Sequence, residues 1–71
     1  MSSECEAIID KLIAQRRRRG ISQRSLAAMT QIQQPVIARM ESKAATPRLD
    51  TILKIAEALG CSLEIVPHEQ Q

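Results

Sequence analysis

The segment that most constrains the fold is residues 22–41, with the sequence SQRSLAAMTQIQQPVIARME. Apolar residues recur at helical spacing in each half of it, and a small residue, Ala27, lies inside the first half. The pattern predicts two short helices, over residues 23–29 and 33–41, joined by a short turn. The small side chain of Ala27 lets the two helices cross closely, so the second can pack on the first and leave its other side exposed.

Two further helical patterns flank this pair. Ser3 followed by Glu6 forms a capping box, so a helix is expected over residues 4–19. Thr46 and Pro47 are typical of an N-cap and a first helical position, which predicts another helix after them. Together the patterns predict an all-α bundle of four to five short helices.

The chain becomes less regular after these helices. Residues 61–67 contain a short β-branched run, and three interpretations are open: a strand, a fifth helical turn or a plain tail. A lone strand would leave its backbone groups unpaired, so it would pair with the same segment of a second copy. Leu63 and Ile65 would then share one face, with Leu59 in the same dimer contact. The competing interpretation packs Leu63 on its own core.

The composition limits the chain to one small domain with an aliphatic core. None of its 71 residues is Phe, Tyr or Trp, which also removes the stacking platforms of single-strand-binding modules. We expect a domain over residues 1–67 and a frayed tail over residues 68–71. No apolar run approaches the roughly 20 residues of a membrane span, and the acidic N-terminus is unlike a signal peptide. A cytoplasmic protein without a membrane partner is therefore expected.

Residues that could carry catalysis or bind a metal are scarce. The only histidine, His68, lies near the polar C-terminus, and Cys5 and Cys61 are far apart in the sequence. The chain has no paired carboxylates, no glycine-rich phosphate loop and no Cys/His cluster. We therefore expect no enzyme, no cofactor and no metal site.

The charge is unevenly distributed along the chain. Residues 16–48 contain eight of the ten basic residues and only one, Glu41, of the eight acidic residues. The two ends of the chain are acidic. A basic middle between acidic ends predicts one cationic surface that faces a polyanion.

The ordered set of these residues resembles a known family. Residues 16–63 are similar to the Cro/repressor-type helix-turn-helix domain, a lambda-repressor-like fold found in phage repressors and xenobiotic-response-element regulators. The matching residues are Arg16, Ile21, Ser22, Gln23, Leu26, Ala27, Ile32, Val36, Ile37, Arg39, Met40, Glu41, Pro47, Leu49, Thr51, Ile52 and the run from Ile55 to Gly60. The family favours glycine at two positions where this chain has Gln31 and Lys43. A residue other than glycine weakens the backbone fit there, because a positive φ is costly for it.

The resemblance implies a DNA-binding surface. Gln34 matches the family's base-reading position, and Gln33, Ala38 and Arg39 lie on the same exposed side of the predicted helix as further candidates for base contacts. Gln23 matches the family's phosphate-bridging position, and the positive charges of Arg17, Arg18, Arg24 and Lys43 make them further candidates for phosphate contacts. The Gln34 amide can pair with adenine N6 and N7, whereas Arg39 could reach either a guanine or a phosphate. The resemblance also implies a buried structural ion pair between Arg16 and Glu41.

Two functions follow from the resemblance, and the sequence leaves both open. One is a transcriptional regulator, expected to be a repressor, that binds a palindromic operator in double-stranded DNA as a homodimer. The other is the antitoxin of a bacterial toxin–antitoxin pair, which neutralises a toxin protein and represses its own operon. Compact domains that end in a Leu-x-Ile-x-Pro stretch resemble this second class, and a neighbouring toxin gene would favour it. A third interpretation, a protein-interaction domain that has lost DNA binding, is disfavoured by the polar residues Gln34 and Arg39.

Overall fold

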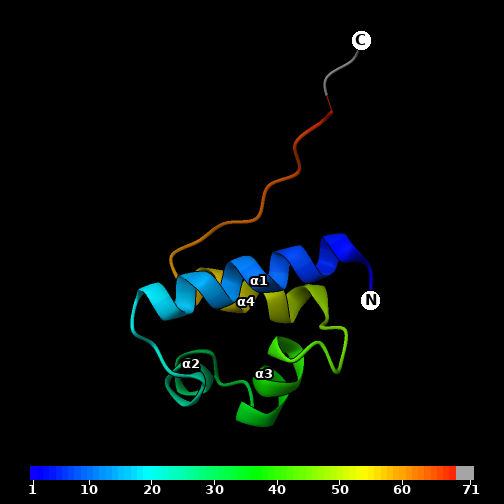
Figure 1. Cartoon of the computed structure of the whole chain (residues 1–71). Coiled ribbons are helices and arrows are strands. Elements are labelled where there is room, and N and C mark those ends of the chain that lie inside the picture. The colour runs from blue at the N-terminus through cyan, green and yellow to red at the C-terminus, as the bar shows by residue number, and fades with distance from the viewer. Residues whose placement is uncertain (69–71) are drawn as a thin grey trace.

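The computed structural model describes residues 1–68, which contain four helices (Figure 1). They are α1 (Ser3–Arg18), α2 (Gln23–Thr30), α3 (Gln34–Glu41) and α4 (Leu49–Ala58). Residues 61–68 lie outside any helix or strand. The predicted all-α bundle with a helix-turn-helix is thus confirmed. The tail predicted over residues 68–71 lies outside the described residues, except for His68.

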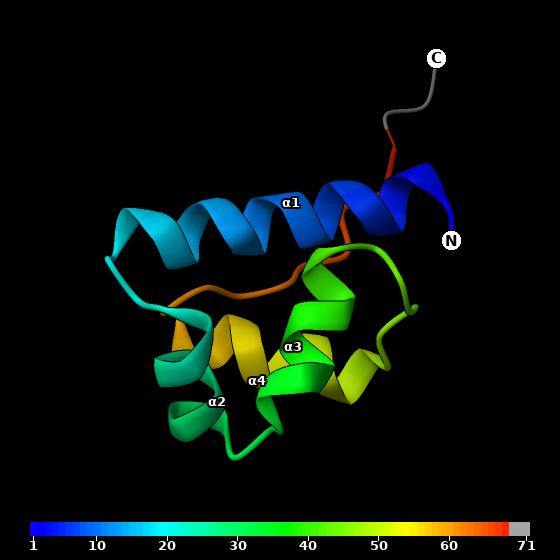
Figure 2. The ribbon, with the colours of Figure 1, turned by 60° about the horizontal axis from the view of Figure 1, so that its bottom comes forward.

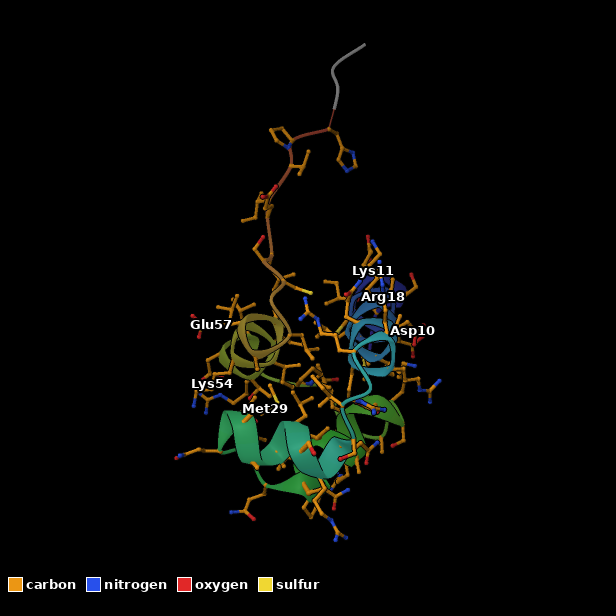
Figure 3. The ribbon with its side chains drawn as sticks, turned by 90° about the vertical axis from the view of Figure 1, so that its left-hand side faces the viewer. Asp10, Lys11, Arg18, Met29, Lys54 and Glu57 are labelled. Carbon is orange, nitrogen blue, oxygen red and sulfur yellow. The ribbon has the colours of Figure 1, made fainter. Side chains whose placement is uncertain are left out.

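The helices pack in two layers. Figures 1 and 3 show α1 and α4 side by side, with α2 and α3 across one side of this pair. Figure 2 brings α2 and α3 to the front of α4 and shows that α3 also approaches α1. The arrangement leaves the outer sides of α2 and α3 on the same side of the molecule.

One face of every helix contributes to an aliphatic core. Its buried residues are Ile9, Leu12, Leu26, Ile37, Met40, Ile52, Ile55, Ala56 and Leu59. Leu59 is fully buried among them, so its predicted place in a dimer contact is wrong. It follows Ile52 by seven residues and Ile55 by four, which puts it on the same inward face at helical spacing.

Serine residues cap the first two helices. Ser2 Oγ accepts a hydrogen bond from the Cys5 backbone N–H at 3.1 Å, and Ser22 Oγ accepts one from the Ser25 backbone N–H at 3.0 Å. The prediction for Ser22 is confirmed. The predicted cap at Ser3 is wrong by one residue, because Ser2 has the extended backbone that an N-cap needs and Ser3 is already helical.

The third and fourth helices begin without a side-chain cap. Pro35 lies in the first turn of α3, as expected, and Gln33 is the extended residue before it. The predicted cap at Thr46 and Pro47 is wrong. The backbone carbonyl that accepts the first hydrogen bond of α4, from the Ile52 N–H at 3.1 Å, belongs to Arg48, which is itself extended.

Among residues 1–68, two residues other than glycine have a left-handed backbone. Gln31 ends α2 with a φ of 59°, and Lys43 follows α3 with a φ of 64°. These are the two positions at which the resemblance favoured glycine. A left-handed backbone costs a residue with a Cβ about 1–2 kcal/mol, so both chain reversals next to α3 are strained.

The strain at Gln31 leads to a stability prediction. Gln31→Gly is expected to raise the free energy of unfolding by about 0.5–1 kcal/mol, because relief of the strain exceeds the extra backbone freedom of glycine in the unfolded chain. Urea denaturation of both proteins measures the change. As a control, Gln15→Gly inside α1 is expected to lose about 1 kcal/mol. A loss of stability in Gln31→Gly would contradict the left-handed conformation.

Candidate nucleic-acid interface

A threonine fixes the turn between α2 and α3. Thr30 Oγ1 donates a hydrogen bond to the Leu26 carbonyl at 2.8 Å and accepts one from the Ile32 backbone N–H at 3.3 Å. Ile32 in turn packs against the core. This role of Thr30 was not predicted from the sequence, although threonine near a helix end commonly bonds to the carbonyl four residues earlier. The turn holds α3 in a defined orientation on α2.

A buried ion pair joins α1 to the end of α3. Arg16 Nε donates to Glu41 Oε2 and Arg16 Nη2 donates to Glu41 Oε1, both at 2.8 Å. Arg16 Nη1 donates to the Ile21 carbonyl, also at 2.8 Å. The side chains of Arg16 and Glu41 are only 10% and 7% exposed. The structure therefore contains the ion pair that the resemblance implied, and its two-bond geometry orients the carboxylate.

Two glutamines extend this ion pair to the start of α3. Gln23 Nε2 donates to Glu41 Oε1 at 2.9 Å, and Gln34 Nε2 donates to Gln23 Oε1 at 3.1 Å. Both glutamines are half-buried. We call the four side chains of Arg16, Glu41, Gln23 and Gln34 the polar relay. The polar relay links α1, α2 and α3 and holds the first side chain of α3 in place.

The outer side of α3 faces solvent. Among the residues predicted to read bases, Gln33 and Arg39 are exposed, and Gln34 and Ala38 are half-buried. Ile37 points the other way, into the core. With 3.6 residues per turn, Gln34 and Ala38 lie one above the other on α3, next to Arg39. The structure thus brings the predicted base-reading residues to one region of the surface.

A family model described as helix-turn-helix matches residues 12–66, which include α2, the turn and α3. The chain belongs to the helix-turn-helix family. An uncharacterized HTH-type transcriptional regulator of Haemophilus influenzae is 44% identical over 61 residues, which cover 86% of this chain and 62% of that relative. A solved structure described as a toxin-antitoxin module from Streptococcus pneumoniae is 43% identical, with a TM-score of 0.74 over 96% of this chain and 83% of that one.

The exposed arginines lie on different sides of this helix-turn-helix domain. Arg24 is in the first turn of α2, next to Gln23 of the polar relay. Arg18 lies about 200° around α1 from the buried Arg16. Figure 3 shows Arg18 with Lys11 on the side of α1 away from α2. The predicted phosphate contact by Arg18 is therefore corrected, because its position on α1 separates it from the outer side of α3.

Lys43 is held by α1 of the helix-turn-helix domain. Its Nζ lies 2.6 Å from Asp10 Oδ1, and its side chain is 29% exposed. In the free protein Lys43 ties the segment after α3 to α1, and a phosphate contact by Lys43, which would replace this ion pair, stays a prediction. Arg17 lies seven residues after Asp10, on the same face of α1, and is exposed. Arg17 therefore stays available for a backbone phosphate.

Within residues 1–68 no group of three or more His, Cys, Asp and Glu side chains is placed to hold a metal ion. None of the helices in this range has the length and apolar character of a membrane span. Cys5 and Cys61 are free thiols.

The C-terminal segment of the domain, residues 61–68, exposes apolar side chains. Ile65 is 100% exposed, Val66 71% and Leu63 37%. Leu63 borders a shallow groove beside α1 that Ile8 also lines. Figure 1 shows the segment leaving the bundle on the side opposite α2 and α3. The described residues therefore leave an apolar surface uncovered, away from the outer side of α3.

Proposed function

We propose that this protein is a transcriptional repressor that binds a palindromic operator in double-stranded DNA as a homodimer. In this proposal α3 enters the major groove and α2 crosses the DNA backbone. The observation that supports it is the polar relay, which holds Gln34 at the start of α3. The outer side of α3, next to Gln34, faces solvent and can contact bases. The protein acts by occupying DNA in the cytoplasm and catalyses no reaction.

The residues of α3 have distinct tasks in this proposal. Gln34 pairs with the N6 and N7 atoms of an adenine, and Ala38 contacts a thymine methyl group. Arg39, which is exposed further along α3, reaches a guanine or a phosphate. Gln33, exposed just before the helix, adds a polar contact at the edge of the groove.

The start of α2 is proposed to bind the DNA backbone. Gln23 and Arg24 lie in its first turn, where backbone N–H groups without helical partners also favour an anion. Arg17 adds a positive charge from α1. These contacts position the domain without reading sequence.

The homodimer is proposed to form through the C-terminal segments. The support is the uncovered apolar surface at Leu63, Ile65 and Val66. Because this surface lies opposite α2 and α3, a contact there leaves both copies of α3 free to meet DNA. Pairing of residues 61–67 with the same segment of a second copy would also satisfy their backbone groups.

Salt dependence of DNA binding tests the proposal. With Arg17, Arg24 and Arg39 of both subunits on phosphates, affinity for a duplex from the protein's own promoter should fall roughly 10³-fold between 50 and 200 mM salt. Arg24→Ala is expected to make the log–log salt slope shallower by about 1.8, and the matched control Arg18→Ala to leave it unchanged. Titrations at several salt concentrations measure both slopes. Equal affinity for single strands and duplexes would contradict the proposal.

A specific observation favours a second candidate function, that of an antitoxin. The structure from Streptococcus pneumoniae with 43% identity is described as a toxin-antitoxin module. In this candidate function the protein also binds a toxin encoded beside its own gene. Expression of each neighbouring gene with and without this chain tests it. Growth arrest that expression of this chain relieves would support the antitoxin function. If no neighbouring gene causes growth arrest, the antitoxin function is contradicted and only the repressor function remains.

A further inference from the structure

We propose that the groove beside α1 binds residues 61–65 of a second copy of this chain, as a strand that pairs with residues 61–65 of the first copy. The inference rests on the proposed homodimer and defines its contact: the edge of the segment that pairs, the register of the pair and the part played by α1. It is carried by one backbone hydrogen bond, by the grooves that border the segment and by the charge of one groove wall.

Two shallow grooves border the C-terminal segment where it leaves α4. Figures 2 and 3 show the segment passing between α1 and α4. On one side lies the α1 groove, whose helical wall includes Ile8, Lys11 and Leu12. On the other side lies the α4 groove, whose helical wall includes Leu53 and Lys54. Residues 61–63 form the opposite wall of both grooves.

One backbone hydrogen bond determines which of the two grooves can hold a paired strand. The Cys61 N–H donates to the Ala56 carbonyl of α4 at 2.8 Å. Backbone groups of successive residues in an extended chain point to alternate edges, so those of Cys61 and Leu63 point toward α4, and those of Ser62 and Glu64 toward α1. Among residues 1–68, no backbone–backbone hydrogen bond involves residues 62–68. The edge beside α1 is therefore free, and a second strand fits in the α1 groove.

The side chains of the segment restrict the register of the pair. Cys61 packs against the core, so Cys61, Leu63 and Ile65 form the inner face of the extended segment. Side chains directly opposite each other in an antiparallel pair share one face. A two-fold axis at Leu63 places the two Leu63 side chains opposite each other and Ile65 of each copy opposite Cys61 of the other. The fully exposed Ile65 is then covered by the second copy.

The outer face and the hydrogen bonds agree with this register. Glu64 of each copy lies opposite Ser62 of the other, whose hydroxyl can donate to the carboxylate. Cys61 falls in a pair without inter-strand hydrogen bonds, which leaves its N–H for Ala56. An axis at Glu64 would instead place two carboxylates opposite each other, which is destabilising. An axis at Ile65 would place Glu64 opposite the apolar Val66.

Charge also favours the α1 groove for this segment. Glu64 is the only charged residue in the range 61–67. The α1 wall contains Lys11 and no acidic residue, and Figure 3 shows Arg18 on the same side of α1. Within residues 1–68 neither Lys11 nor Glu64 forms an ion pair. The α4 wall contains Glu57 as well as Lys54, so it attracts a negative segment less.

Disulfide trapping tests the register, with Cys5→Ser in every protein. Opposite residues of an antiparallel pair have Cα atoms roughly 4.5–5.5 Å apart, a distance that a disulfide can span. Ile65→Cys should therefore link to the native Cys61 of the second copy when oxidised glutathione is added. Non-reducing electrophoresis should show most of the protein as a covalent dimer. Val66→Cys, on the outer face, is the matched control and should stay unlinked, as should the protein with the native Ile65.

Removal of the native thiol checks which residues are linked. Cys61→Ser combined with Ile65→Cys should abolish the covalent dimer. A link that survives Cys61→Ser would join the two copies of position 65 directly, which means an axis at Ile65 and overturns the register. A sedimenting dimer that Ile65→Cys does not link overturns it too.

Charge reversal tests which groove holds the second copy. Lys11→Glu places a negative charge beside Glu64 of the second copy and should weaken the dimer on the order of 10-fold at low salt. Lys54→Glu, an equally exposed lysine in the α4 groove, is the matched control and should leave the dissociation constant unchanged. Lys11→Glu combined with Glu64→Lys should restore the dimer. Sedimentation equilibrium without DNA measures all three constants.

The outcomes separate the α1 groove from the homodimer itself. A dimer that Lys54→Glu weakens as much as Lys11→Glu, or more, would overturn the assignment to the α1 groove and leave the homodimer standing. A wild type that is monomeric at every concentration would contradict the proposed homodimer. The α1 groove would then be open to another protein, such as a toxin.

Discussion

Arg16→Met is expected to lower the free energy of unfolding by about 3–5 kcal/mol, a large part of the roughly 5–15 kcal/mol that holds a native domain together. The substitution leaves the Glu41 carboxylate, which is 7% exposed, without its counter-charge and without two hydrogen bonds. The Ile21 carbonyl also loses its donor. Guanidinium chloride denaturation followed by circular dichroism measures the loss.

Two further variants show whether the loss comes from the buried charge. Arg16→Met combined with Glu41→Leu should recover much of the stability, because no charge then remains buried. Arg18→Met, two residues further along α1 and exposed, should change stability by less than about 0.5 kcal/mol. An Arg16→Met protein with an unchanged unfolding midpoint would mean that the ion pair is exposed or absent in solution.

Deletion of residues 62–71 is expected to convert the proposed dimer to a monomer and to lower operator affinity on the order of 100-fold or more. Two linked α3 helices bind one palindrome with a high effective concentration, which separate monomers lack. The deletion keeps Cys61, whose backbone N–H donates to the Ala56 carbonyl at 2.8 Å, so α4 should stay helical. Sedimentation velocity and operator titration measure the two effects.

A point substitution tests the same contact without shortening the chain. Ile65→Asp should also give a monomer, and because Ile65 is 100% exposed in the single chain, the fold of the monomer should not suffer. Glu64→Gln, on the opposite face of the extended segment, is the matched control and should remain a dimer. A deleted protein that still sediments as a dimer would move the interface away from residues 61–67.

Much of the fold could be predicted because apolar spacing and local signals agree. The helix-turn-helix over α2 and α3 follows from the apolar pattern of residues 22–41 and from the cap at Ser22. The helix starts were less predictable where two suitable residues adjoin, as at Ser2 and Ser3, because only the backbone conformation decides which of them caps. The helical spacing of Leu59 already indicates a buried position. Its assignment to the dimer contact overlooked this spacing.

The candidate site was harder to predict where it depends on distant residues. The contact of Gln23 with Glu41 spans 18 residues, and that of Lys43 with Asp10 spans 33. No local pattern marks such pairs, since the first depends on how α2 packs against α3 and the second on how α1 lies beside the segment after α3. Arg18 was assigned to phosphate from its charge alone. The position of Arg16 on the apolar face already implied that Arg18 lies on the far side of α1.

Selection of binding sites from a random pool of duplexes tests most directly whether α3 reads DNA. The wild type is expected to enrich a palindrome whose half-sites lie about one helical turn, ~34 Å, apart. Gln34→Ala should enrich the same palindrome with one relaxed base pair in each half-site, and should bind the original site more weakly by ~1–3 kcal/mol. A wild type that enriches no sequence would contradict the proposal that α3 reads DNA. A Gln34→Ala protein that selects the same bases as the wild type at every position would contradict it too.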